Sequence, residues 1–326
     1  MCATTFERYR ARVLIQIAGI VAGLILLSYA ADQFVVGAAR LAVALRMSAI
    51  AIGAVVIGFG TSAPELLVSA IAASRGSVDI AVGNVVGSNL ANMTLVLGTA
   101  ALITPIATTS GVLKREAPLS VASVVVFAVL IQGTFGVLQG AVLALVLTGS
   151  LAIVLRSSRD DPSELPEQVE GWVATRTPDT RREIARTVIS LLVTLGAAHL
   201  LIVSATGLAS SMGISEGFVG VTIVAIGTSL PELATAIQAA RRNQTDLLVG
   251  NLLGSNLFNA GAVGATIAFI GRAPVTDPML VGPASLAMLG AVFLSFVFLV
   301  TGARVVRWEG LTLLALYAAT LPMLAG

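Results

Sequence analysis

The sequence predicts an all-α integral membrane protein with about ten transmembrane helices in two inverted five-helix repeats. The first observation is composition, because 56% of the 326 residues are hydrophobic and only 11% are charged. A soluble domain carries about 25% charged residues. The second observation is a series of bilayer-length apolar runs, and the third is an internal repeat. Together they exclude a soluble enzyme fold and predict several membrane crossings.

Each apolar run holds roughly the 17–25 residues that a membrane-spanning helix needs. The first follows the N-terminal segment and is too long for a signal peptide, so we expect it to be retained as a helix. Tight turns or short polar segments separate the other runs. The predicted spans cover residues 12–39, 47–74, 79–103, 117–133, 136–156, 184–212, 215–241, 246–270, 278–301 and 304–325.

One polar linker, residues 157–183, divides these spans into two sets of five. It contains the segment DDPSELPEQVE, and its acidic residues do not have EF-hand spacing. We therefore predict a first repeat over 1–156, with its motifs at 58–98, and a second over 184–326, with its motifs at 225–265. Because five is odd, the second repeat enters the membrane from the opposite side, as in many secondary transporters.

The distribution of Lys and Arg predicts the orientation of the chain. With the N-terminus and the loops after spans 2, 4, 6 and 8 on one side, that side carries five of the 19 basic residues and the other carries fourteen. Basic residues concentrate in cytoplasmic loops. We therefore expect a multi-pass protein of the cell or inner membrane, with a cytoplasmic 157–183 linker and both termini external.

Two pairs of motifs carry the internal repeat. Residues 60–65 read GTSAPE and residues 227–232 read GTSLPE, while 83–92 read GNVVGSNLAN and 250–259 read GNLLGSNLFN. Aligned without gaps at a constant offset of 167 residues, 60–92 and 227–259 share 18 of 33 positions. A match this dense indicates duplication.

Glu65 and Glu232 stand at equivalent places in this repeat, each inside an apolar segment. A carboxylate in such a segment costs roughly 3 kcal/mol on insertion scales, which makes both glutamates candidates for a functional site. No intramembrane Lys or Arg is available to pair with them. The neighbouring polar residues also offer oxygen atoms. In the first repeat these residues are Thr61, Ser62, Ser88 and Asn92, and in the second Thr228, Ser229, Ser255 and Asn259.

This donor set favours a hard cation over zinc or copper. The chain has one cysteine, Cys2, and one histidine, His199, for which we expect a role in helix packing. Pro64 and Pro231 disturb helical hydrogen bonding just upstream, so we expect freed carbonyls around Gly58 and Ala225 to turn toward an ion.

Other residues that the two motifs share have structural interpretations. The four glycines at 83, 87, 250 and 254 are suited to close helix approach. The amides of Asn84, Asn89, Asn251 and Asn256 are expected to form hydrogen bonds between helices.

These motifs resemble the repeats of the sodium/calcium exchanger family, within the cation/calcium antiporter superfamily. The motifs cover about a fifth of the chain, and the layout of ten spans covers the rest. The resemblance implies exchange of external sodium for calcium by alternating access, with spans 1 and 6 sliding over the remaining helices. It implies ion ligation by the ten polar and acidic residues above and by the backbone carbonyls of Gly58 and Ala225. Some relatives carry Asp where this chain has Asn259, which makes potassium coupling less expected.

Alternative functions remain open from the sequence alone. Proton/calcium exchange, or exchange of another divalent cation, would use the same glutamates, and a cation channel would line a pore with the same polar residues. A non-transporting receptor or scaffold is a further class. The chain has no nucleotide-binding motif, so we expect no enzyme, ATP-driven pump or bound cofactor. The expected partners are Ca²⁺ and Na⁺ as substrates and the lipid bilayer, with no nucleic acid and no obligatory protein partner.

Overall fold

A computed structural model describes residues 2–44, 62–107, 116–157, 179–241, 243, 245–302 and 304–325. The first half contains α1 (Cys2–Ala44), α4 (Ala63–Ser74), α5 (Val78–Ala91), the π-helical turn η2 (Asn92–Val96), α6 (Leu97–Ile103), α8 (Glu116–Leu130) and α9 (Val137–Ser157). The described part of this half ends at Ser157, the first residue of the predicted linker. Residues 158–178 lie outside the described part.

The second half repeats this order and begins with α11 (Thr180–Met212), whose first turn is capped by Asp179 through the Arg181 amide at 3.1 Å. Its remaining helical segments are α12 (Glu216–Val219), η4 (Gly220–Val224), α13 (Ala225–Thr228), α14 (Leu230–Arg241), α15 (Thr245–Phe258), η5 (Asn259–Val263), α16 (Gly264–Gly271), η6 (Leu280–Ala284), α17 (Ser285–Gly302) and α18 (Arg307–Ala325).

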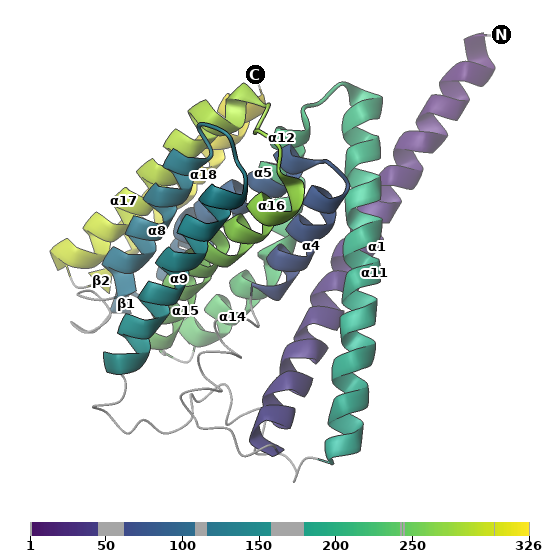
Figure 1. Ribbon diagram of the computed structural model, residues 1–326. Helices are drawn as coiled ribbons and strands as arrows, with labels where there is room; N and C mark the ends of the chain where they lie inside the picture. Colours follow the sequence, from purple (N-terminus) through teal and green to yellow (C-terminus); the bar gives the residue numbers. More distant parts are fainter. Residues whose placement is uncertain are drawn as a thin grey trace.

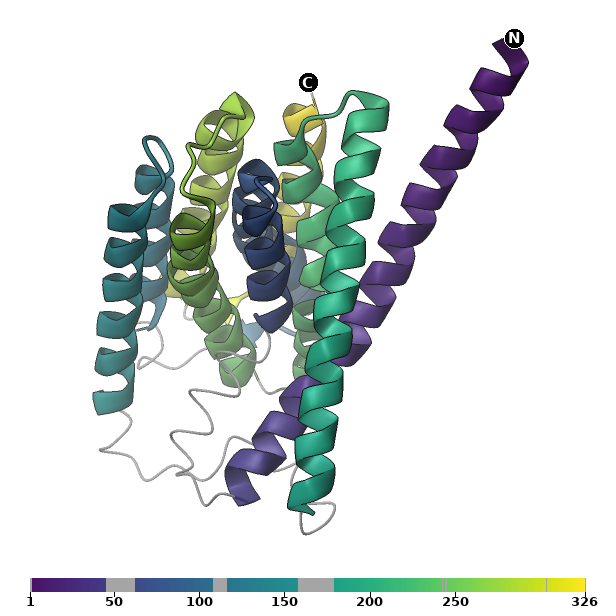
Figure 2. The same ribbon diagram turned by 45° about the vertical axis from the view of Figure 1, so that its right-hand side comes forward.

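The architecture confirms the predicted fold class, an all-α membrane protein of two inverted five-helix repeats. Among the described residues, six helices are long and apolar enough to cross a membrane, and the bent pair 216–228 with 230–241 makes a seventh. The described helices also include α18 and the shorter α4 and α8, which fall within the predicted runs 304–325, 47–74 and 117–133. Figures 1 and 2 place both chain ends at the same end of the molecule, as an even number of crossings requires.

The two repeats interlock. Helix α4 packs against α16 and η5, and its counterpart α14 packs against α6 and η2. The offset of 167 residues turns the contacts of α4 into those of α14, because it relates α16 to α6 and η5 to η2. A two-fold relation between the halves produces this pattern. The motif-bearing helices therefore meet in the middle of the protein.

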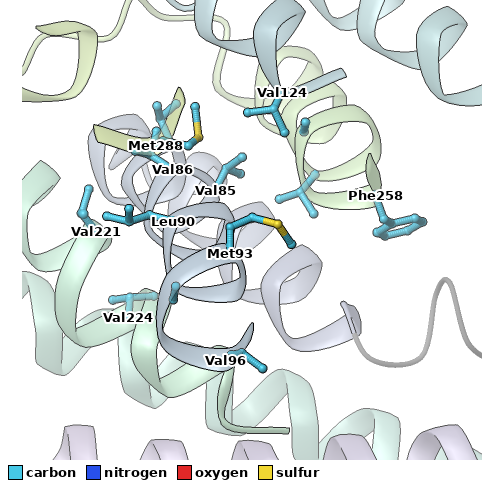
Figure 3. Packing of buried hydrophobic residues seen from close by; sticks show 14 of the residues in the cluster. Val85, Val86, Leu90, Met93, Val96, Val124, Val221, Val224, Phe258 and Met288 are labelled. Carbon is cyan, nitrogen blue, oxygen red and sulfur yellow. The ribbon is translucent and has the colours of Figure 1, made fainter. Parts of the chain in front are cut away.

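The centre of this arrangement is the continuous span α5–η2–α6. Of its most apolar window, 94% is buried, against 17% for α9 at the periphery. A glycine face allows the close packing: a Cβ atom on Gly83 would lie 3.0 Å from the Cα of Gly220, and one on Gly87 would collide with Val221 and Ala225. Figure 3 shows Val85, Val86 and Leu90 of this span packed beside η4 and α17.

The close-packing role predicted for Gly83 and Gly87 is thus confirmed. For Gly250 and Gly254, the equivalent partners would fall within residues 50–58, outside the described residues.

Helices α1 and α11 form a long pair at one side of the bundle (Figures 1 and 2). A Cβ atom on Gly23 would lie 3.1 Å from the Cβ of Leu201, so the backbones approach closely. Near one end Gln16 donates a hydrogen bond to Ser211 at 3.1 Å, and near the other Arg40 pairs with Glu183 at 3.3 Å. These contacts hold the two helices together along their length.

A two-stranded antiparallel ribbon, absent from the prediction, joins the halves at one end. Strand β1 (Ile106–Ala107) pairs with β2 (Arg304–Val305), with Ile106 opposite Val305. Two-residue strands are too short for a period-two pattern to reveal them in a sequence.

Candidate cation site

In both GTS-x-PE motifs a helix begins directly after the serine. Ser62 directly precedes α4 with φ −92° and ψ 9°, and Ser229 lies between α13 and α14 with φ −85° and ψ 5°. The proline two residues later lies in the first turn of the new helix, where its missing N–H costs no intrahelical bond. In the second repeat the chain bends by 41° at this point. Both motifs therefore begin a helix in the same way, and in the second repeat this start follows a break between α13 and α14.

The helix start after each serine places Glu65 and Glu232 in the first turns of α4 and α14. Both side chains are fully buried. The partial positive charge of a helix N-terminus stabilises a carboxylate there. No ion pair joins either glutamate to a described Lys or Arg. Their charges are therefore compensated only by dipoles, and a bound cation would find both carboxylates without a competing base.

Serines connect the glutamates across the repeats. The Ser229 hydroxyl donates to Glu65 Oε1 at 3.4 Å, and the Ser255 hydroxyl donates to Glu232 Oε1 at 3.3 Å. Ser62 of the first repeat lies 2.8 Å from Ser255 of the second, measured between their Oγ atoms. Each glutamate also has a second oxygen, Oε2, that is buried and has no hydrogen-bond partner among the described residues.

The second motif contributes further free oxygens. Asn92 and Asn259 are the first residues of the π-helical turns η2 and η5, and both are fully buried. π-helical turns inside α-helices are frequent at functional sites. The Oδ1 atoms of both asparagines and the Oγ atom of Ser88 are buried without a hydrogen-bond partner among the described residues. Buried polar atoms without partners are rare in folded proteins, and the binding of an ion is one common explanation.

Asn84 has a different role, because its side chain is fully bonded. Its amide nitrogen donates to Ser69 Oγ at 3.0 Å and to the backbone oxygen of Glu65 at 3.4 Å, while its oxygen accepts from Thr228 Oγ1 at 3.1 Å. Asn84 thus links α4 of the first repeat to α13 of the second, which confirms the predicted bond between helices. The sequence motif did not reveal its link to Thr228.

Asn256 and Asn89 differ in their hydrogen bonds. Asn256 accepts from Asn92 at 3.0 Å, a bond between helices as predicted. Asn89 instead donates to Val85 O in its own helix at 2.9 Å, so the bond between helices predicted for Asn89 is wrong in this structure. His199 contacts the guanidinium of Arg75 at 2.9 Å, which joins α11 to the end of α4.

The structure describes ten of the twelve predicted site residues; Thr61 and Gly58 lie outside the described residues. The carbonyl of Ala225 accepts from the Ser229 amide at 3.0 Å and faces the Thr228 hydroxyl at 3.3 Å. Proline at 231 removes the amide that would bond Gly227, four residues earlier, and leaves this bond in place. Ligation by Ala225 stays a prediction.

The arrangement can hold a hard cation. All of the polar atoms it gathers are carboxylate, hydroxyl or amide groups, the ligand types that Ca²⁺ and Na⁺ accept. Within the described residues no group of three or more His, Cys, Asp or Glu could hold a metal ion. Two carboxylates without nitrogen or sulfur ligands differ from a zinc or copper site.

Fold and site together define a multi-pass membrane transporter in which two inverted repeats enclose an oxygen-lined centre. The model of the sodium/calcium exchanger protein family matches residues 15–156 and 183–325. The chain belongs to the sodium/calcium exchanger family.

Similar proteins of known sequence agree with this assignment. The chain is 38% identical to the putative antiporter CaxA of Alkalimonas amylolytica, over 75% of this chain and 77% of that protein. It is 28% identical to the sodium/calcium exchanger MaX1 of Methanosarcina acetivorans, over 93% and 96% of the two chains. A solved structure of the sodium-calcium exchanger NCX_Mj superposes with a TM-score of 0.64 at 31% identity, covering 95% of this chain and 99% of the other. The chain is therefore a cation antiporter by family, and its relatives are transporters rather than enzymes.

Proposed function

We propose that this antiporter exchanges sodium for calcium by alternating access, with the ions bound between Glu65 and Glu232. One observation carries the proposal. Each of these two fully buried glutamates has one oxygen that accepts a hydrogen bond from a serine and another that has no partner in the part of the chain that the structure describes. A buried carboxylate that lacks a basic partner requires compensation, and a transported cation supplies it.

Charge explains the coupling. The two glutamates contribute two negative charges, which one Ca²⁺ neutralises and two or three Na⁺ neutralise or exceed. The two ions have similar radii, so a flexible cage of oxygens accepts either. An empty site would carry both charges across lipid uncompensated, which is unfavourable. Sodium and calcium therefore compete for shared ligands, and the protein crosses between its two access states only when loaded.

The pair α1–α11 is the element suited to change access. Its helices are joined to each other by the Gly23–Leu201 approach and by the Arg40–Glu183 ion pair. It packs on α4 and α12 at one side of the bundle, while the motif helices interlock with each other at the centre. Sliding of this pair over an unchanged centre would open the site to one face at a time.

Proton/calcium exchange is the competing function. The free Oε2 atoms of Glu65 and Glu232 can take protons instead of sodium, which would neutralise the same two charges. Family membership does not separate the two, because both use the same carboxylates. A cation channel is disfavoured by the inverted repeat, which is typical of alternating access.

Calcium flux into vesicles containing the purified protein separates these functions. We expect an outward sodium gradient to drive uptake of radioactive calcium, and an outward proton gradient at equal sodium on both sides to drive none. Uptake driven by the proton gradient alone would replace sodium with protons in the proposal. Uptake that follows the calcium gradient alone, with neither counter-ion required, would indicate a channel.

A further inference from the structure

The equivalence of the two repeats makes their polar networks directly comparable. The offset of 167 residues pairs five polar side chains of one set with five of the other. The bonded set contains Ser62, Glu232, Ser255, Asn92 and Asn256. Its counterpart, the mirror set, contains Ser229, Glu65, Ser88, Asn259 and Asn89. Each residue is chemically identical to its counterpart, and each is at most 3% exposed.

Hydrogen bonds connect the bonded set without a gap. Ser255 donates its single hydroxyl hydrogen to Glu232 Oε1 at 3.3 Å, so Ser62 is the donor in the 2.8 Å contact with Ser255. The amide nitrogen of Asn92 donates to Ser255 Oγ at 3.4 Å and to Asn256 Oδ1 at 3.0 Å. Both amide hydrogens of Asn92 are therefore used, and its carbonyl oxygen is left free as a ligand.

The mirror set lacks this chain. The Oγ atom of Ser88, both polar side-chain atoms of Asn259 and the Oδ1 atom of Asn89 have no hydrogen-bond partner among the described residues. Asn89 turns its amide to Val85 O in its own helix. Ser229 donates directly to Glu65 at 3.4 Å. None of the hydrogen bonds within the bonded set has an equivalent in the mirror set. In particular, no hydrogen bond joins Asn259 to Asn89 or to Ser88.

The residue types and the burial of the two sets are matched, so neither accounts for this difference. We interpret the two sets as two conformations of one network within a single molecule. In the bonded set Asn256 Nδ2 also has no hydrogen-bond partner among the described residues, but more polar atoms lack one in the mirror set. Buried polar atoms without partners are unfavourable, so the mirror set would gain hydrogen bonds by closing. Packed polar networks of this kind switch between discrete arrangements rather than deforming continuously.

We propose that Asn256 and Asn89 are positioning residues that act in alternation, each orienting the ligand asparagine of its own set in one access state. Asn256 holds Asn92 in the state described here, and Asn89 holds Asn259 in the opposite state. The bonded arrangement passes from one set to the other as access changes. This inference rests on the proposed function and adds two residues to it that bind no ion themselves.

Side-specific calcium affinity tests the inference. An apparent affinity depends on the fraction of protein in the state that faces the ion, so a shift in the access equilibrium changes the two faces in opposite directions. We measure sodium-coupled calcium transport of wild type, Asn256→Leu and Asn89→Leu in right-side-out and in inside-out vesicles. The quantity compared is the ratio of apparent affinities at the two faces. Leucine is branched at Cγ like asparagine, although larger, and its side chain makes no hydrogen bond.

We expect the two variants to change this ratio in opposite directions, each by about tenfold, the lower end of the effect of removing a residue that orients a metal ligand. Thr94→Val is the matched control, because Thr94 is buried nearby but donates only to Leu90 O in its own helix; its ratio should equal that of wild type. If a leucine variant does not fold, the serine variants Asn256→Ser and Asn89→Ser replace the pair, with the same expectation.

A shift of both variants in the same direction, or no shift in either, would overturn the alternation while leaving sodium/calcium exchange intact. Loss of thermal stability with an unchanged ratio would likewise assign both residues a purely structural role. Absence of sodium-coupled flux in wild type would instead overturn the proposed function, and the alternation with it.

Discussion

Ser229, from the second repeat, donates its hydroxyl hydrogen to Glu65, from the first, over 3.4 Å. The contact crosses the interface between the repeats, because Ser229 lies directly before α14 and Glu65 lies in the first turn of α4. The other oxygen of Glu65, Oε2, has no hydrogen-bond partner among the described residues. The Glu65 carboxylate is therefore oriented by a serine from the other repeat.

Asn259→Asp should introduce pH dependence and a new response to potassium. A third carboxylate beside Glu65 and Glu232 places three like charges in a desolvated site, which favours uptake of a proton or of an additional monovalent cation. The measurement is sodium-driven calcium flux of wild type and variant at a series of pH values around neutrality, with and without potassium. Identical profiles would remove Asn259 from the site.

Asn84→Ala should weaken calcium binding without abolishing transport. Asn84 fixes Thr228 and the first turn of α4, so its loss leaves these groups less well oriented, and we expect the apparent affinity for calcium to fall about 10- to 100-fold. Ser69→Ala is the matched control, since Ala236 stands at the equivalent place in the second repeat and the bond from Asn84 to Thr228 survives. An equal loss in both variants would contradict this role.

Gly23→Leu should separate α1 from α11. A Cβ at this position would already lie 3.1 Å from Leu201, and a larger side chain would force the helices apart at a cost of about 1–3 kcal/mol. We expect a lower unfolding temperature and a slower maximal flux. Gly196→Leu, at an exposed position of α11 with no described atom within 4 Å of its Cβ, should change neither. Wild-type flux in Gly23→Leu would argue against a moving pair.

Orientation is the fourth prediction. In a Cys2→Ala background, Ser163→Cys in the linker should resist impermeant thiol reagents in intact cells, whereas Thr134→Cys, on the side assigned as external, should react. The excess of basic residues on the linker side is the physical basis. The reverse labelling pattern would place both termini in the cytoplasm.

Much of the fold followed from the sequence because a membrane leaves few choices for the backbone. Apolar runs predicted the helices, the odd number of spans in each repeat predicted the inversion, and Pro231 predicted the break at Ser229. The repeat also predicted that Glu65 and Glu232 would occupy equivalent places, and the structure shows both in the first turn of a helix.

Other features of the site had no such signal. The π-helical turns that begin at Asn92 and Asn259 span only five residues each, which is too short for apolar periodicity to reveal them. The free carbonyl expected at Ala225 is bonded here, because helix breaks displace specific bonds that depend on register. The difference between Asn256 and Asn89 could not be predicted, since both lie in the same GSNL motif and differ in the conformation of their hydrogen-bond networks.

The central claim is that Glu65 and Glu232 together hold the transported cation, and sodium-driven calcium flux of the single glutamine variants tests it most directly. Glu65→Gln and Glu232→Gln each remove one charge and keep the shape, so Ca²⁺ would be left under-compensated in a low-dielectric site. The control is Glu309→Gln, a buried glutamate that accepts from the Val306 amide at 2.8 Å and lies outside the site. We predict that both site variants fold like wild type and transport no calcium, while Glu309→Gln transports normally. Near-normal sodium-driven calcium flux in either Glu65→Gln or Glu232→Gln would contradict the account.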